Sequence, residues 1–236
     1  SKNFIFLRNI AYSYSSGLIA QTQSYKSYIQ NHISKLRVEV IYNPLRNMQH
    51  DGMDRENRIL FLGRLEPKKG AKYLIQAAKI IKNDLIKNNW TISIVGDGSQ
   101  RNFLEALSSE YSLSKVIKFE GMSHDSDRWF HSSKVFIFPS LMEGFPNSLA
   151  EAMISGLACI SFDCETGPRE LIKNQVNGVL IETKNVEKLS EEILNLIKSP
   201  SKINMLSENA KLVKDKLDSD DICKKYFTFC DRVSNG

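Results

Sequence analysis

The chain has 236 residues, of which 42% are hydrophobic and 25% are charged. This composition is typical of a globular protein with one or two cores, and it excludes a disordered or fibrous protein. No stretch approaches the roughly 18–20 consecutive apolar residues that a membrane-spanning helix needs. Residues 1–9 lack the charged start and apolar core of a signal peptide, so we expect a cytoplasmic protein.

The formal net charge is +5, and the lysines are scattered along predicted helices rather than gathered in one block with aromatic residues between them. This pattern does not indicate nucleic-acid binding. Solvated helix faces explain most of the charge, and peripheral contact with anionic lipid headgroups at the inner face of a membrane is compatible with it.

The cysteines and histidines show no metal-ligand spacing. The nearest acidic pair is Asp125 and Asp127, but these residues open a predicted helix, where aspartate usually caps free N–H groups. We therefore expect chemistry without a bound metal ion and without a cofactor. Cys223 and Cys230 lie seven positions apart in a helical segment, and we expect them to share a buried face.

The first part of the chain holds few elements. Apolar runs at 17–22 and 38–44 predict two strands, and the amphipathic segment 24–35 between them predicts a helix. Residues 1–44 are therefore interpreted as the tail of a domain that is mostly absent from the chain, in preference to an appendage of the main sheet. Residues 45–57 are predicted to be a linker because they are mostly polar.

Residues 58–236 alternate strand-like and helix-like segments. Continuous apolar runs predict strands at 59–63, 91–96, 116–121, 135–139, 157–162 and 178–181. Helices are predicted at 71–88, 99–109 and 125–131, from Ser148 and from Pro168, and at 186–198, 200–215 and 219–232. Buried strands separated by helices indicate an α/β fold with a parallel sheet that helices cover on both faces.

Polar loops that carry glycine follow five of the predicted strands. They are residues 63–70, 96–99, 120–125, 139–148 and 163–168. Ligands of parallel sheets bind at the carboxyl ends of strands, and glycine lets the backbone approach a ligand closely. The loops therefore favour a ligand-binding edge over simple turns.

Glu143 and Glu151 lie eight positions apart, in the loop 139–148 and in the helix that follows it. The N-terminus of a helix that begins at Ser148 suits an anion, and the two carboxylates can accept hydrogen bonds from hydroxyls on either side of a diphosphate. The alternative is a capping box, in which Ser148 caps the helix and Glu151 reaches back to it. Both explanations hold together if Ser148 is the cap while Glu151 turns outward.

Arg64 and Lys69 lie in the loop 63–70, directly after a predicted strand. An arginine fork and a compact lysine charge are expected where a diphosphate binds and where negative charge grows as it departs. The alternative is a solvated loop in which Lys68 and Lys69 only serve solubility. The position on the same predicted sheet edge as Glu143 favours the phosphate site.

Five motifs occur in order along the chain: GRLEPKKG, VGDG, KFEG, FPSLMEGFPNSLAEAMISG and GPREL. With them the chain resembles the nucleotide-binding half of a retaining glycosyltransferase of the GT-B fold, in family 4 (glycosyl transferases group 1). The resemblance covers residues 58–236 and implies a Rossmann-like donor-binding domain whose last helix packs back on the N-terminal part. Residues 1–44 resemble the closing strand–helix–strand of the acceptor-binding domain.

The resemblance also implies roles for single residues. Arg64 and Lys69 match the basic pair that binds the donor diphosphate, in the loop that Gly63 opens. Glu143 matches the glutamate near the donor sugar, and Glu151 matches the one that binds the ribose hydroxyls. Lys118 and Phe119 lie where such proteins present their backbone to the nucleotide base. The backbone that meets the phosphates and the sugar is implied to be that of Gly144, Phe145, Pro146, Asn147, Ser148 and Leu149.

The implied reaction transfers a sugar from a nucleotide diphosphate to an acceptor hydroxyl, with retention at the anomeric carbon. A UDP-sugar is the favoured donor and a GDP-sugar the alternative. The acceptor is implied to be a glycan or a lipid-linked sugar in bacterial surface polysaccharide assembly, such as O-antigen or capsule. Arg64, Lys69 and the helix N-terminus would stabilise the departing diphosphate, while Glu143 positions the sugar.

Two other functions stay open at this point. A non-hydrolysing nucleotide-sugar epimerase shares the two-domain architecture but needs further catalytic acids and a histidine near the sugar. A catalytically silent nucleotide-binding module has no need to keep all four of the charged site residues. Because the Gly-rich loop and the acceptor-binding residues of the family have no counterpart here, we expect a fragment that binds the donor and transfers little or no sugar alone.

Overall fold

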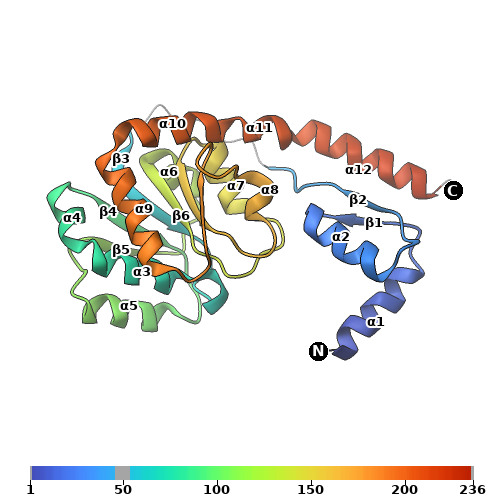
Figure 1. Cartoon of the computed structure of the whole chain (residues 1–236), viewed down its shortest axis with the longest axis horizontal. Helices are drawn as coiled ribbons and strands as arrows, with labels where there is room; N and C mark the ends of the chain where they lie inside the picture. Colours follow the sequence, from blue (N-terminus) through green and yellow to red (C-terminus); the bar gives the residue numbers. More distant parts are fainter. Residues whose placement is uncertain (1, 46–53, 235–236) are drawn as a thin grey trace.

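The computed structural model describes residues 2–45 and 54–234, and its largest feature is a six-stranded sheet (Figure 1). The strands pair in the order β5-β4-β3-β6-β7-β8, and all neighbours are parallel. Their bounds are β3 (Glu56–Leu62), β4 (Thr91–Val95), β5 (Ile117–Gly121), β6 (Ser133–Phe138), β7 (Ala158–Phe162) and β8 (Val179–Ile181). The predicted α/β fold with a Rossmann-like parallel sheet flanked by helices is confirmed.

Helices cover both faces of this sheet because strand residues alternate between two hydrophobic clusters. In β3, Ile59 and Phe61 belong to the first cluster and Leu60 belongs to the second. The first cluster is closed by α3 (Ala71–Ile80), α4 (Lys82–Lys87), α5 (Arg101–Glu110) and α9 (Val186–Lys198). The second is closed by α6 (Ser126–Ser132), α7 (Asn147–Ile154), α8 (Pro168–Leu171) and α11 (Val213–Lys216), while α10 (Pro200–Lys211) contributes to both.

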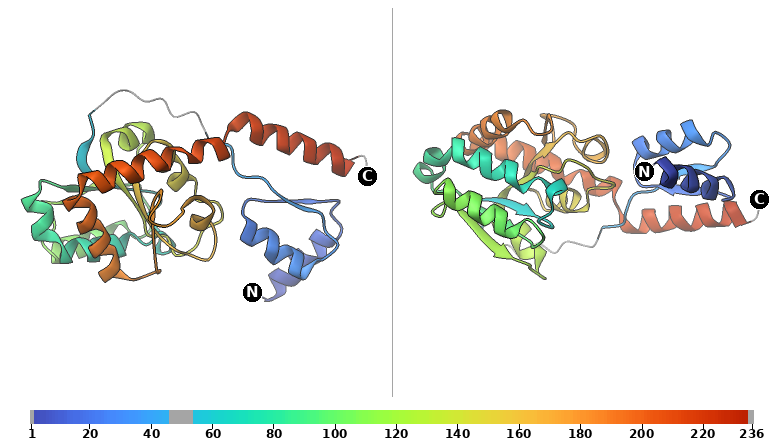
Figure 2. Two further views of the ribbon diagram at one scale, coloured as in Figure 1. Left: turned by 45° about the horizontal axis from the view of Figure 1, so that its top comes forward. Right: turned by 90° about the horizontal axis from the view of Figure 1, so that it is seen from below.

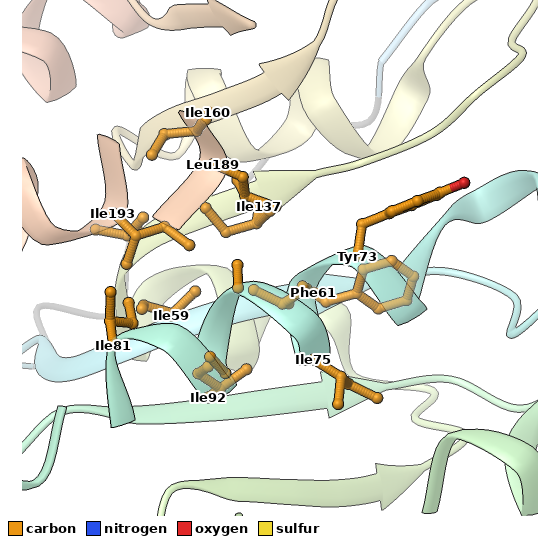
Figure 3. Packing of buried hydrophobic residues seen from close by; sticks show 14 of the residues in the cluster. Ile59, Phe61, Tyr73, Ile75, Ile81, Ile92, Ile137, Ile160, Leu189 and Ile193 are labelled. Carbon is orange, nitrogen blue, oxygen red and sulfur yellow. The ribbon is translucent and has the colours of Figure 1, made fainter. Parts of the chain in front are cut away.

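The first cluster shows how strands and helices interdigitate (Figure 3). Branched isoleucines from the strands suit a pleated, fully covered surface, and burying each such side chain contributes roughly 1.5–3 kcal/mol relative to leaving it exposed. The cluster fixes the strands and thereby the loops at their carboxyl ends. The residues labelled in Figure 3 are Ile59, Phe61, Tyr73, Ile75, Ile81, Ile92, Ile137, Ile160, Leu189 and Ile193.

The N-terminal part contains a two-stranded parallel sheet with two helices, and α12 (Ser219–Ser234) runs alongside it in every view (Figures 1 and 2). A Cβ built on Gly17 would lie 2.7 Å from the ring of Phe229. Arg37 donates a hydrogen bond to the carbonyl of Arg232 at 3.2 Å, and Arg232 pairs with Glu39 at 3.3 Å. The elements of this part are α1 (Lys2–Ser13), β1 (Leu18–Ala20), α2 (Gln23–His32) and β2 (Val38–Val40).

Several predicted boundaries differ from the structure. β3 begins at Glu56, so the last two residues of the expected linker belong to a strand, and residues 46–53 of that linker lie outside the described residues. The helix predicted at 71–88 is divided into α3 and α4 because Ile81 leaves helical geometry, with φ −102° and ψ 16°. The helix predicted at 200–215 is likewise divided into α10 and α11, and α1 was not predicted.

Cys223 and Cys230 are exposed, so the prediction that they share a buried face was wrong. The buried residues of α12 are Ile222 and Phe229, which are also seven positions apart. They precede the cysteines by one position each, which turns the buried face by about 100° around the helix.

Candidate functional site

The strand order creates a switch point between β3 and β6. From β3 the chain moves outward through β4 to β5, and from β6 it moves outward in the opposite direction through β7 to β8. Loops that leave neighbouring strands at such a point diverge and open a crevice, where ligands of parallel sheets bind. The two loops concerned are residues 63–70 after β3 and residues 139–146 after β6.

Main-chain contacts fasten these two loops to each other. The N–H of Leu141 donates to the carbonyl of Lys68 at 2.8 Å. Gly70, at the end of the short 3₁₀ turn η1 (Pro67–Lys69), has φ +70°, and a Cβ there would lie 1.9 Å from the carbonyl oxygen of Pro139. Only glycine permits this approach. The turn therefore presents Lys69 to the β6 loop.

Lys69 and Glu143 form an ion pair across the switch point. Nζ of Lys69 lies 2.6 Å from Oε1 of Glu143, and the two side chains are 20% and 10% exposed. The same Nζ lies 5.9 Å from the centre of the Phe138 ring, which is within cation–π range. The pair offers a ligand one cation for phosphate oxygens and one carboxylate that accepts hydrogen bonds from hydroxyls.

Arg64 is exposed and lies outside the Lys69–Glu143 contact. The backbone on either side of Arg64 is fixed, because the N–H of Gly63 donates to the carbonyl of Val95 at 3.0 Å and the N–H of Leu65 donates to that of Asp97 at 2.9 Å. The guanidinium therefore extends from a rigid loop at the same sheet edge, where it can turn toward a ligand.

The helix after the β6 loop begins at Asn147, one residue before the predicted start. Pro146 occupies the N-cap position, and the helix has no side-chain cap hydrogen bond. The predicted capping by Ser148 was therefore wrong. Glu151 is the fifth helical residue, beyond the third position from which a capping box reaches back, so capping does not explain it.

The carbonyl of Pro146 accepts the first hydrogen bond of the helix, from the N–H of Ala150 at 3.0 Å. It also accepts a hydrogen bond from the N–H of Leu149 at 3.0 Å, one of the donors that a side-chain cap would otherwise serve. The N–H of Asn147 donates to the carbonyl of Phe145 at 3.1 Å. Two of the backbone donors that the resemblance assigns to the phosphates and the sugar, those of Asn147 and Leu149, are thus used inside the loop.

The loop also contacts the segment that follows β2. Nδ2 of Asn43 donates to Oδ1 of Asn147 at 3.0 Å, and the rings of Tyr42 and Phe145 lie 5.4 Å apart. In contrast, a Cβ built on Gly144 would have nothing within 4 Å. The loop is therefore anchored at Phe145 and Asn147 and open at Gly144.

Lys118 and Phe119 lie on β5, at the edge of the sheet and two strands from β3. The side chain of Lys118 is exposed, whereas Phe119 pairs with Ile94 and packs against the first hydrophobic cluster. The N–H of Gly96 donates to the carbonyl of Gly121 at 2.7 Å, which links the end of β5 to the loop after β4. Lys118 and Phe119 thus stand on the β4–β5 side, apart from the ion pair.

Sequence reasoning missed two side chains that support the site. Glu66 accepts a hydrogen bond from Oγ of Ser99 at 2.8 Å, and this bond lowers the pKa of the Glu66 carboxyl. Thr166 donates through Oγ1 to the main-chain carbonyl of Glu143. The only sequence signal was that each residue lies in a polar loop that follows a strand.

A pocket of about 470 Å³ opens beside Glu143. Its walls come from the N-terminal part, from the loops after β6 and β7, and from α12, so it lies where these segments meet. The volume is within the range of small-molecule sites, and the amide and hydroxyl groups suit a ligand rich in hydroxyls. The lining residues are Ile19, Gln21, Thr22, Tyr25, Glu143, Gly144, Thr166 and Tyr226.

No group of three or more His, Cys, Asp or Glu side chains that could bind a metal ion occurs in residues 2–45 and 54–234. Within the same described ranges, every helix is too short or too polar to cross a membrane.

The model of a family described as glycosyl transferases group 1 matches residues 47–213. The chain belongs to this family. An uncharacterised glycosyltransferase of Methanocaldococcus jannaschii is 31% identical over 192 residues, which are 75% of this chain and 47% of that protein. The Escherichia coli UDP-Gal:α-D-GlcNAc-diphosphoundecaprenol α-1,3-galactosyltransferase is 34% identical over 152 residues, which are 64% of this chain and 38% of that protein. The chain thus spans about half the length of the curated relatives it matches.

The fold agrees with the family. A crystal structure of a Staphylococcus aureus TarM variant in complex with fondaparinux, α-GlcNAc-glycerol and UDP superimposes with a TM-score of 0.83 at 23% identity. The match covers 90% of this chain and 43% of the TarM chain. The predicted GT-B relationship of the Rossmann-like domain is confirmed by this likeness in fold.

Proposed function

We propose that the site of this glycosyltransferase binds a nucleotide diphosphate sugar and serves retaining transfer of the sugar to an acceptor hydroxyl. The observation that carries the proposal is the Lys69–Glu143 ion pair at the switch point between β3 and β6. An adjacent cation and carboxylate match the two parts of such a donor, because the diphosphate carries negative charge and the sugar carries hydroxyls.

The other site residues are likewise divided between groups that bind the diphosphate and groups that bind hydroxyls or the base. Arg64 joins Lys69 on the diphosphate, and the N-terminus of α7 adds the positive end of its dipole. Glu151, farther along α7, binds the ribose hydroxyls. The backbone at Lys118 and Phe119 faces the base on the β4–β5 side. The nucleotide would then lie along the carboxyl edge of the sheet.

In the proposed reaction, the bond between the anomeric carbon and the diphosphate oxygen breaks. The acceptor oxygen bonds to the same carbon on the face from which the diphosphate leaves, and the acceptor proton passes to the departing diphosphate. Arg64 and Lys69 stabilise the charge that develops there. Glu143 positions the sugar and forms no covalent bond. Because side chains supply the positive charge, we propose that the step needs neither a metal ion nor a cofactor.

Two comparisons support a UDP-sugar as the donor and a lipid-linked sugar as the acceptor. The name of the E. coli relative contains UDP-Gal and a diphosphoundecaprenol acceptor, and UDP is bound in the TarM structure. We therefore propose a role in bacterial surface polysaccharide assembly at the cytoplasmic face of the membrane. Because the chain spans about half of its relatives, we propose that it binds the donor alone but transfers little sugar.

Calorimetric titration of the chain with UDP, GDP and ADP, each free and sugar-linked, tests this proposal. One nucleotide series should bind, and Lys69→Gln should weaken its binding about tenfold because a cation on the diphosphate is lost. Lys68→Gln removes the same charge from the neighbouring exposed residue and should bind like the wild type. Absence of binding in all three series, or equal weakening by both variants, would contradict the proposal.

A further inference from the structure

The loop between β7 and α8, residues 163–167, packs against the loop after β6 that carries Glu143. Oγ1 of Thr166 donates a hydrogen bond to the main-chain carbonyl of Glu143. Next to it, Gly167 has φ +102°, and a Cβ built there would lie 2.9 Å from the carbonyl oxygen of Gly144 and 3.0 Å from Cδ of Pro146. The two loops thus pack backbone against backbone, with no room for a side chain at Gly167.

Thr166 is itself firmly placed. Sγ of Cys164 donates to the carbonyl of Thr166 at 3.4 Å. Cys164 is buried, and burial raises the pKa of its thiol to about 11, so the thiol keeps the proton that it donates. At the start of the loop, the N–H of Asp163 donates to the carbonyl of Ile181 on β8 at 2.7 Å. The loop that carries Thr166 is therefore attached to the sheet.

The Glu143 carboxylate is held from the other side by Lys69. A glutamate side chain has three rotatable bonds, so the position of its carboxylate depends on the main chain as well as on the ion pair. When a diphosphate engages Lys69, the ion pair weakens. The hydrogen bond from Thr166 to the Glu143 carbonyl does not involve the lysine.

We propose that Thr166 is a positioning residue, whose hydroxyl fixes the main chain of Glu143 so that the carboxylate faces the sugar of the donor. The inference rests on the proposed function and adds a residue that the motifs do not assign. Thr166, Glu143 and Gly144 line the same pocket of about 470 Å³. A shift of this loop therefore alters the sugar end of the site, while the cations of the β3 loop stay in place.

Two variants separate the hydroxyl from the shape of the side chain. Thr166→Val keeps the volume and removes the donor, whereas Thr166→Ser keeps the donor and removes a methyl group. The dissociation constants of the full chain are measured for UDP and for UDP-glucose, UDP-galactose and UDP-N-acetylgalactosamine. The GDP series is used instead if GDP binds the wild type more tightly. Hydrogen exchange of the amides in residues 141–147 is measured without nucleotide.

Thr166→Val is expected to weaken the best nucleotide sugar about tenfold and the free nucleotide less than about twofold. It should also speed amide exchange in residues 141–147. Thr166→Ser should leave the dissociation constants of the nucleotide sugar and the free nucleotide, and the amide exchange rate, at their wild-type values. Thermal unfolding of each variant shows whether the fold is intact, and a merely structural role would weaken free nucleotide and nucleotide sugar alike.

Equal weakening of both ligands, no weakening, or lack of rescue by serine would overturn the positioning role. So would a wild-type chain that binds the free nucleotide as tightly as every nucleotide sugar, because the sugar would then make no contact for Glu143 to govern. A wild-type chain that binds no nucleotide would overturn the proposed function, and the role of Thr166 with it. Unchanged amide exchange in Thr166→Val would refute the loop support independently of any ligand.

Discussion

Lys69 and Glu143 neutralise each other at 2.6 Å in a place where both side chains are largely shielded from water. A diphosphate that attracts Lys69 must also approach the Glu143 carboxylate, which repels it. Sugar hydroxyls relieve this conflict because they donate hydrogen bonds to the carboxylate. At the scale of single residues, we therefore expect the ion pair of the proposed site to favour a nucleotide that carries a sugar over a bare nucleotide diphosphate.

Glu143→Gln should change the two affinities in opposite directions. Free UDP should bind about three- to tenfold more tightly, because the repulsive charge is gone and Lys69 is no longer paired. The matching nucleotide sugar should bind less tightly, because a neutral amide is a weaker acceptor for its hydroxyls. Calorimetry measures both constants. Glu165→Gln makes the same charge change at an exposed residue of the loop after β7 and should alter neither constant. Changes of both constants in the same direction in Glu143→Gln would refute the proposed conflict between the carboxylate and the diphosphate.

The sequence locates part of this site for a physical reason. Arg64, Lys69 and Glu143 follow apolar runs, and parallel strands bring such loops to one edge. The order of the strands, which makes β3 and β6 neighbours and lets Lys69 touch Glu143, has no counterpart in the sequence pattern. Thr166 was missed because a hydroxyl bound to a distant carbonyl leaves no periodic signal. The cap at Ser148 was predicted from a local pattern that ignored Pro146.

At the scale of elements, apolar runs locate the strands well because the two clusters bury most strands on both faces. The edge strand β5 is the exception, since Lys118 and Glu120 are exposed there. The break between α3 and α4 escaped prediction because Ile81 is itself buried and continues the apolar pattern through the break. Contacts between loops depend on close approach of the two backbones, which the pattern of apolar residues does not predict. Gly70 is the clearest case, since its left-handed conformation lets the β3 loop touch Pro139.

Gly70→Ala should lower the free energy of unfolding by about 2–4 kcal/mol. An L-residue at this φ costs roughly 1–2 kcal/mol, and the added Cβ would lie 1.9 Å from a backbone oxygen, so the β3 and β6 loops must separate. Urea unfolding measures the effect. Gly144→Ala is the matched control and should stay within about 0.5 kcal/mol, because its Cβ meets nothing within 4 Å. The same midpoint for both variants would show that the loops are not joined at Gly70.

Across the whole molecule, Glu170 on α8 joins three distant segments. Its Oε1 accepts the N–H of Gln23 at 2.8 Å, and its Oε2 accepts the hydroxyl of Tyr42 at 3.0 Å. Lys216 donates to the main-chain carbonyl of Glu170 at 2.6 Å and lies 4.7 Å from the centre of the Tyr42 ring. Contacts over such separations cannot be predicted from local patterns. The contacts of Glu170 fix the position of the N-terminal part relative to α8, and residues of the N-terminal part form one wall of the pocket beside Glu143.

The Tyr42–Glu170 hydrogen bond predicts a pH dependence of stability. Burial, and then the charge of Glu170 and the hydrogen bond, raise the pKa of Tyr42 from 10.0 to about 12. A pKa that is raised on folding contributes stability that is complete below the unfolded value and is lost as the pH rises through the folded one. The contribution of Tyr42 should therefore persist to about pH 10 and disappear by about pH 12.

Tyr42→Phe should lower the free energy of unfolding by about 1 kcal/mol at neutral pH, a figure reduced for the partial exposure of the ring. The difference from the wild type should shrink between about pH 10 and 12, because the wild-type hydroxyl loses its proton there. Urea unfolding at several pH values measures it. Tyr14→Phe, at a residue that is 88% exposed, should show no such difference. A difference that stays constant through this pH range would contradict the raised pKa of Tyr42. No difference at neutral pH would mean that the ring contact with Phe145, which phenylalanine keeps, holds residue 42 without help from the hydroxyl.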